Sequence, residues 1–182
     1  KAGETWVNHS WGSQIVLYGV WELAGNAGLA LYTTFLAVVG MMALYPICAG
    51  NVYVRAFVVL IGAITAAVFW SARPQMFSFA LSSIFLLILF QYKRGGKDRL
   101  WLIPPLMLVW GNLHAGFSIG FIFLIGFIGG ELLGHIFAKD KTGIIPMRGI
   151  GKLVIITGLS VVALVINPYG FAMLRVPFDT VS

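Results

Sequence analysis

The sequence contains very little charge. Asp, Glu, Lys and Arg together make up 10% of its 182 residues, against roughly 25% in an average soluble domain. Hydrophobic residues make up 59%, and the mean hydropathy is +0.93. A soluble fold cannot bury that much apolar surface, whereas a lipid bilayer solvates it. The composition therefore excludes a soluble globular domain and predicts an all-α, polytopic membrane protein.

Cysteine and the common catalytic motifs are also scarce. Cys48 is the single cysteine, so an intrachain disulfide is excluded. The sequence has no CxxC, no HExxH and no cysteine–histidine spacing typical of zinc sites, and we predict no metal site and no certain cofactor. It also lacks a Walker loop and a nucleophile elbow.

The positive charge is concentrated in short segments between apolar runs. Segments 93–99 and 139–152 carry four Lys or Arg residues each, and Arg55 follows another short turn. Nine of the twelve bases are then expected on the cytoplasmic side, with Lys1, Arg73 and Arg175 outside. The formal charge of +6 therefore indicates contact with anionic membrane lipids, not with nucleic acid.

Apolar runs predict about six transmembrane helices and one extracytoplasmic interfacial helix. Since about 20 helical residues cross the hydrocarbon core, we expect a single transmembrane domain over 1–182. The interfacial helix is expected over 10–24 and the spans over 27–48, 52–71, 75–92, 100–113, 116–137 and 152–167. The chain starts at Lys1 without an initiator Met, which indicates an internal segment truncated at both ends.

Two spans have unusual composition. Pro104 and Pro105 predict that the fourth is kinked or stops short of the far surface. The fifth has glycines with GxxxG spacing, which predicts close helix packing. These are Gly116, Gly120, Gly126, Gly130 and Gly134. Glu131 and His135, four residues apart on that span, are interpreted as a structural pair.

Polar and aromatic motifs are expected at the ends opposite the basic segments. Arg73 stands between Ala72 and Pro74-Gln75, on a side where the positive-inside bias disfavours a base. Its guanidinium can bind a phosphate bidentately, with Gln75 donating to the same ligand. Alternatively, Arg73 extends to lipid headgroups or pairs with a loop carboxylate.

Three further motifs share this side. Asn112 and His114 lie in Trp110-Gly-Asn-Leu-His-Ala-Gly-Phe117, where they either tie the turn together or line a cavity. Asn8 and His9 form a second polar cluster with Trp11. The last motif is predicted to be a helix stop and turn. It consists of Asn167, Pro168, Tyr169 and Gly170.

Taken in order, these motifs resemble a group of bacterial multi-pass membrane proteins related to the GT-C glycosyltransferases, of the dolichyl-phosphate-mannose and aminoarabinose transferase type. The resemblance extends from Trp6 to Gly170. It implies transfer of a sugar from a polyprenyl-phosphate donor, at the extracytoplasmic face of the bacterial cytoplasmic (inner) membrane. The resemblance makes Arg73 the lipid-phosphate contact, and the cavity would be lined by Asn8, His9, Gln75, Asn112 and His114.

These residues do not identify a catalytic residue, which stays unknown. GT-C enzymes carry a catalytic acid in the first external loop, which by this resemblance lies upstream of Lys1. Two alternatives remain open. One is a non-catalytic structural or pigment- and lipid-contacting subunit of a photosynthetic or respiratory complex. The other is a transporter, which would need ionisable residues near mid-membrane.

Overall fold

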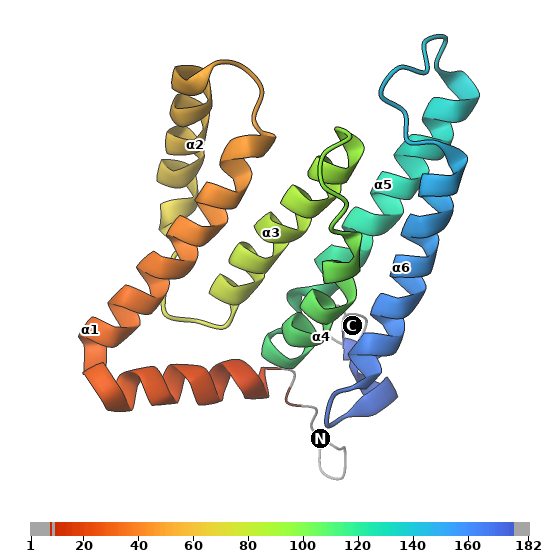
Figure 1. The fold of residues 1–182 in the computed structure, drawn as a ribbon. Helices are drawn as coiled ribbons and strands as arrows, with labels where there is room; N and C mark the ends of the chain where they lie inside the picture. Colours follow the sequence, from red (N-terminus) through yellow and green to blue (C-terminus); the bar gives the residue numbers. More distant parts are fainter. Residues whose placement is uncertain (1–7, 9, 177–182) are drawn as a thin grey trace.

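The computed structural model describes residues 8 and 10–176, and over this part of the chain the fold is all-α (Figure 1). Five of the six helices are long and apolar enough to cross a membrane, so the chain is a multi-pass helical membrane protein. The helices are α1 (Trp11–Leu44), α2 (Val52–Ala66), α3 (Gln75–Lys93), α4 (Ile103–Leu113), α5 (Ser118–Phe137) and α6 (Met147–Val165).

Helix α1 consists of two segments joined at a sharp bend. Gly25 has φ 53° and ψ −142°, which breaks the helical geometry and which glycine adopts without the penalty of a Cβ. In Figure 1 the segment before Gly25 lies across one end of the bundle, and the segment after it rises alongside α3. The first segment corresponds to the interfacial helix expected over 10–24. It buries Ser13 and exposes Ile15 and Tyr18.

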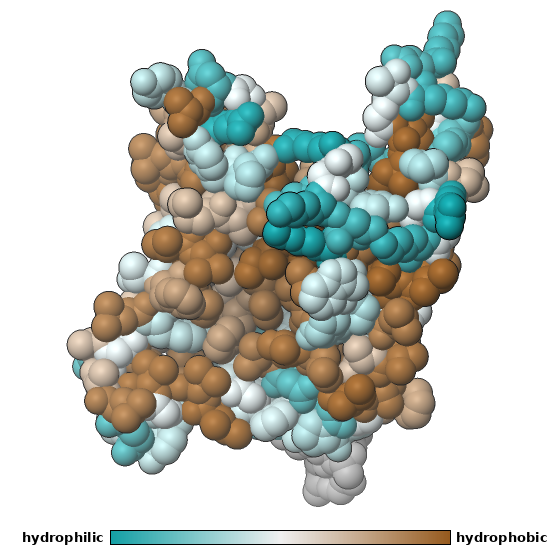
Figure 2. All heavy atoms as spheres, viewed as in Figure 1, coloured by the Kyte–Doolittle hydropathy of each residue, from teal (hydrophilic) through white to brown (hydrophobic). Residues whose placement is uncertain are grey.

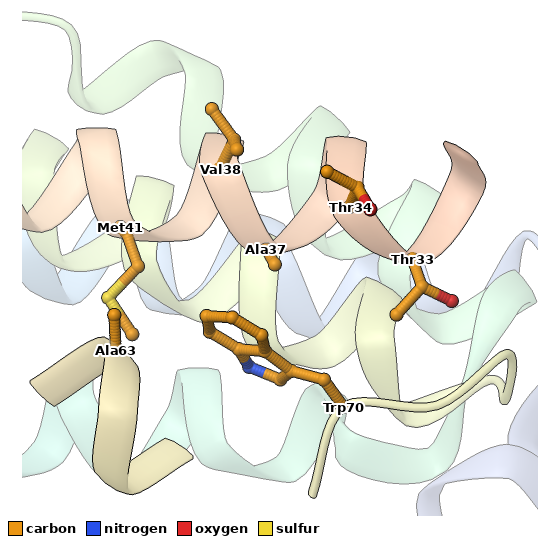
Figure 3. Close-up of a pocket in the computed structure, with 7 residues that line it drawn as sticks. All are labelled: Thr33, Thr34, Ala37, Val38, Met41, Ala63 and Trp70. Carbon is orange, nitrogen blue, oxygen red and sulfur yellow. The ribbon is translucent and has the colours of Figure 1, made fainter. Parts of the chain in front are cut away.

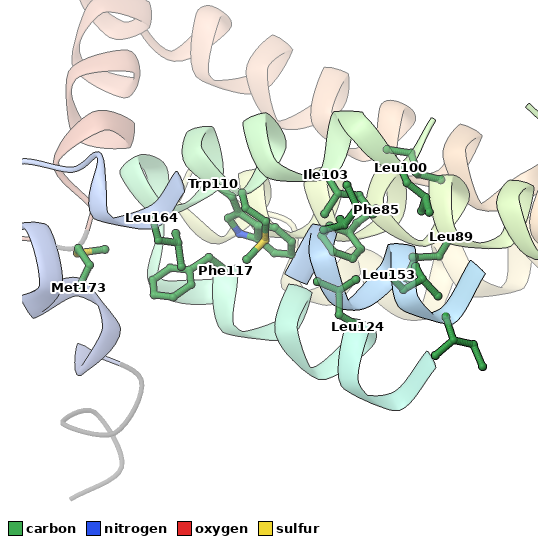
Figure 4. Packing of buried hydrophobic residues seen from close by; sticks show 14 of the residues in the cluster. Phe85, Leu89, Leu100, Ile103, Trp110, Phe117, Leu124, Leu153, Leu164 and Met173 are labelled. Atoms are coloured by element: carbon green, nitrogen blue, oxygen red, sulfur yellow. The ribbon is translucent and has the colours of Figure 1, made fainter. Parts of the chain in front are cut away.

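Helix α4 is short but lies at the centre of the main hydrophobic core. Its prolines occupy the first turn, where a missing N–H removes no helical hydrogen bond, so α4 is short and not kinked within its length. Ile103, Met107 and Trp110 are fully buried. They pack with buried residues of α3, of α5 and the turn before it, and of α6, among them Phe85, Leu89, Phe117, Leu124, Leu153 and Leu164 (Figure 4).

Helix α2 has almost no packing of its own. None of its residues is buried, and large apolar side chains such as Tyr53, Phe57 and Ile64 are exposed. Figure 2 shows hydrophobic residues over most of the surface below a hydrophilic cap. A surface of this kind is stable in lipid and not in water.

The helix connections separate into two ends. The basic end comprises the turns at 45–51, 94–99 and 138–146, which lie at the top of Figure 1. The motif end comprises residues 8–12, 70–75, 110–117 and 166–175 at the opposite end. Within the described chain, Arg73 and Arg175 are the only bases at the motif end, and the other nine lie at the basic end.

Basic side chains tie the basic end together. Arg94 donates to the carbonyls of Pro46 and Ile47, at 2.8 and 2.6 Å, and so fixes the α1–α2 turn to the end of α3. Lys93 forms an ion pair with the buried Glu131. Lys152 of α6 pairs with Asp98 of the α3–α4 loop, and this contact holds the pKa of Asp98 below its usual value.

Glu131 and His135 contact the same loop residue and not each other. Glu131 accepts from the Ile145 N–H at 2.8 Å, and His135 Nε2 lies 2.8 Å from the Ile145 carbonyl. Since this oxygen can only accept, Nε2 of His135 carries the proton. Both residues therefore have a structural role, as expected, and they perform it by holding the α5–α6 loop against α5.

The expected glycine packing occurs at only part of α5. A Cβ at Gly116 would lie 2.3 Å from Ser78 Oγ, and one at Gly120 would lie 2.6 Å from Met107 Sδ. At Gly134 the nearest atom, of Ile144, is 3.2 Å away. Nothing described lies within 4 Å of a Cβ at Gly126 or Gly130. For that pair the prediction of close packing is wrong within this chain, because those glycines face outward.

Candidate functional site at the motif end

A buried chain of hydrogen bonds organises the motif end. Trp110 Nε1 donates to Ser78 Oγ at 2.8 Å, and Ser78 Oγ lies 2.8 Å from His114 Nδ1. The backbone N–H of Gly116 donates to the same ring nitrogen at 3.0 Å. These contacts join the first turns of α3 to the end of α4 and to the 3₁₀ turn η4 (Ala115–Phe117).

The protonation of His114 follows from its partners. A backbone N–H can only donate, so Nδ1 of His114 presents its lone pair to Gly116, and the proton of the neutral ring sits on Nε2. Ser78 then donates to Nδ1 while it accepts from the indole of Trp110. This arrangement positions the imidazole and uses the serine hydroxyl as a bridge.

Asn112 and Asn167 connect the ends of α4 and α6. Asn167 Nδ2 donates to Asn112 Oδ1 at 3.0 Å, and Asn112 Nδ2 donates to the carbonyls of Leu108 and Ile166. Asn167 Oδ1 accepts from the backbone N–H of Tyr169 at 3.0 Å, so this segment ends the helix in a turn. The contacts of Asn112 therefore hold the end of α4 against the end of α6.

The segment of α1 before Gly25 packs against this connection. A Cβ at Gly12 would lie 2.6 Å from the carbonyl oxygen of Asn112, so only glycine permits this approach. Asn8 donates to Gln14 Oε1 at 2.8 Å and accepts from the Ser10 N–H. His9, the other member of that predicted cluster, lies outside the described residues.

Arg73 lies on the short connection before α3. Its carbonyl accepts from the Tyr32 hydroxyl of α1 at 3.3 Å and from the Met76 N–H at 3.1 Å. Its side chain is exposed, as is that of Gln75. Both described ion pairs lie at the basic end, so no carboxylate in the described chain neutralises this guanidinium.

An apolar pocket of about 240 Å³ lies between α1 and α2 beside this connection. Figure 3 shows the Trp70 indole between the two helices, below Ala37 and near Ala63. The indole N–H of Trp70 is buried and has no hydrogen-bond partner among the described residues. The pocket is lined by Thr33, Thr34, Ala37, Val38, Met41, Ala63 and Trp70.

The structure thus gathers some predicted residues and separates others. Asn112 and His114 lie on adjacent turns with Asn167, whereas Arg73 and Gln75 make no described hydrogen bond to that group. Sequence reasoning missed Ser78 and Tyr32. A serine in the apolar run after Gln75 was the available signal, since a polar group buried in a membrane helix needs a partner.

Nothing in the described residues points to a metal centre, because no three His, Cys, Asp or Glu side chains lie close enough together to hold an ion. Comparison of the chain with family models, with curated proteins and with solved structures finds no match in any of the three.

Proposed function

We propose that the protein binds a polyprenyl-phosphate sugar at the motif end and transfers the sugar to an extracytoplasmic acceptor, as GT-C-like enzymes of the bacterial cytoplasmic membrane do. The observation that carries this proposal is Arg73. Its backbone is held by Tyr32 and Met76, its side chain is exposed, and no described carboxylate neutralises it. A guanidinium in that state suits a phosphate, because planar N–H groups bind two phosphate oxygens together.

The surroundings of Arg73 support a lipid-linked ligand. The pocket between α1 and α2 is apolar apart from its threonines, and Trp70, which lines it, lies three residues before Arg73. Tyr32, which binds the Arg73 carbonyl, adjoins Thr33 of the same pocket. A phosphate at Arg73 and Gln75 would therefore lie next to an apolar surface for the first isoprene units.

The remaining residues have supporting roles in this proposal. Asn8, His9 and His114 would line the acceptor side, and the Ser78 bridge holds His114 in one orientation. Asn112, whose polar atoms bind α4 and the end of α6, would support this side structurally. Arg73 would stabilise the leaving phosphate electrostatically. Glu22 is exposed and is the one carboxylate of the described chain at the motif end. The catalytic acid that the resemblance implies is expected upstream of Lys1.

The test is binding of a fluorescent polyprenyl phosphate to the protein in phosphatidylcholine nanodiscs. Arg73→Gln should weaken binding about tenfold, the order expected for loss of a charge-assisted hydrogen bond. Arg175→Gln removes the other described base at this end and should leave affinity unchanged. The matching polyprenol, which has no phosphate, should bind wild type and Arg73→Gln equally. Equal losses in the two arginine variants would reject Arg73 as the phosphate contact.

A second candidate function is a non-catalytic subunit of a larger membrane assembly. The observation that favours it is α2, which exposes large apolar side chains along its length and buries none of its residues. A partner subunit would cover such a helix as well as lipid does. Purification in mild detergent distinguishes the two. Stable co-purification of redox subunits, or a pigment absorption band, would favour the subunit.

A further inference from the structure

A second apolar groove lies away from Arg73, between α5, α6 and the 3₁₀ turn η5 (Gly170–Leu174). It has a volume of about 630 Å³, within the usual range of small-molecule sites, roughly 300–1,000 Å³. Its floor includes the buried Phe117, and its rims include the exposed Ile122 and Ile125. The other lining residues are Ser118, Phe121, Val161 and Leu174.

The shape of the groove matches the depth of one leaflet. The groove extends from Phe117, the last residue of η4 at the motif end, along α5 to Ile125, and eight residues of helix rise about 12 Å. Half of a hydrocarbon core is about 15 Å thick. The groove therefore extends from headgroup level to near the bilayer midplane, which suits one chain of a lipid in the leaflet at the motif end.

The chemistry at the mouth of the groove selects the headgroup. Leu174 lines the groove, and Arg175 follows it directly with an exposed side chain. No carboxylate in the described chain pairs with Arg175. Because η5 follows the end of α6, we expect this guanidinium at the level of the lipid phosphates, where it can bind two phosphate oxygens. Charge complementarity thus favours an anionic headgroup over a zwitterionic one.

We propose that the α5–α6–η5 groove is a binding site for one anionic phospholipid, with an acyl chain against Phe121 and Ile125 and the phosphate on Arg175. This site is separate from the Arg73 site in position and in ligand. It lies between different helices and takes a membrane lipid, not a glycosyl donor. Neither site depends on the other.

The experiment is native mass spectrometry of the full chain released from nanodiscs that contain equal amounts of phosphatidylglycerol and phosphatidylcholine. Wild-type protein should retain one phosphatidylglycerol in preference to phosphatidylcholine. Arg175→Gln should reduce this preference by roughly five- to tenfold while chain binding persists. Arg148→Gln removes an exposed base at the basic end, far from the groove, and should leave the preference intact.

A second pair of variants tests the groove itself. Val161→Phe fills it from α6 and should reduce retention of both lipids. Val154→Phe, two turns away on the same helix and outside the groove, should not. An unchanged phosphatidylglycerol preference in Arg175→Gln, or equal retention in the two phenylalanine variants, would overturn the proposal. A dimer in the wild-type spectrum that Val161→Phe abolishes would assign the groove to a second copy of the chain instead.

Discussion

At the scale of single residues, Ser78 stabilises the motif end through its hydroxyl. Trp110 is fully buried, and its indole N–H donates to Ser78 Oγ. In Ser78→Ala this donor loses its partner, which costs ~1–3 kcal/mol in the free energy of unfolding. Equilibrium unfolding in SDS, followed by helix circular dichroism, measures the loss.

Ser83→Ala is the matched control on the same helix. Ser83 is also buried, but its hydroxyl donates only to the Phe79 carbonyl one turn earlier. That carbonyl also accepts a backbone hydrogen bond within the helix, so it keeps a partner when the hydroxyl is removed. Its removal leaves no buried donor without a partner, so a change below about 0.5 kcal/mol is expected. If both variants lose the same stability, the Trp110–Ser78–His114 chain has no special role.

At the scale of elements, the bend in α1 depends on one glycine. Gly25 adopts φ 53° with nothing within 4 Å of a Cβ, so the cost of Gly25→Ala is conformational and not steric. We expect a loss of ~1–2 kcal/mol, the penalty for an L-residue in left-handed backbone. Gly19→Ala lies in the same segment with equally open surroundings and should be neutral or stabilising. SDS unfolding of the pair measures the difference.

The same element shows what the sequence could and could not predict. The sequence predicted a separate helix over 10–24 and apolar helices after it, because both depend on residues close in sequence, and a helix bend at Gly25 separates the two. Which glycines meet a neighbour depends on how helices rotate, and identical GxxxG spacing gave contact at Gly116 and open space at Gly126. Ser78 escaped notice for the same reason, since its partners lie 32 and 36 residues away.

At the scale of the whole molecule, the asymmetry of charge is matched by an asymmetry of contacts. Several cations at the basic end bind groups of neighbouring elements: Arg94 donates to the carbonyl of Pro46, and Lys93 pairs with Glu131 of α5. The two described cations of the motif end, Arg73 and Arg175, are exposed and have no described carboxylate partner. Bases therefore close one end of the bundle structurally and leave the other end able to bind anions from outside the chain.

This division predicts that the two ends lie on opposite sides of the bilayer, with the motif end outside. Starting from Cys48→Ser, a single cysteine is placed at Ala49 in the α1–α2 turn or at Ala172 in η5, both exposed positions. A membrane-impermeant maleimide should label Ala172→Cys in intact cells, and Ala49→Cys only after permeabilisation, because the basic turns are retained in the cytoplasm. The reverse pattern would invert the orientation. Labelling of both cysteines in intact cells would mean that an odd number of the five helices between them does not cross the membrane. The helix concerned would then be α4, which is the shortest.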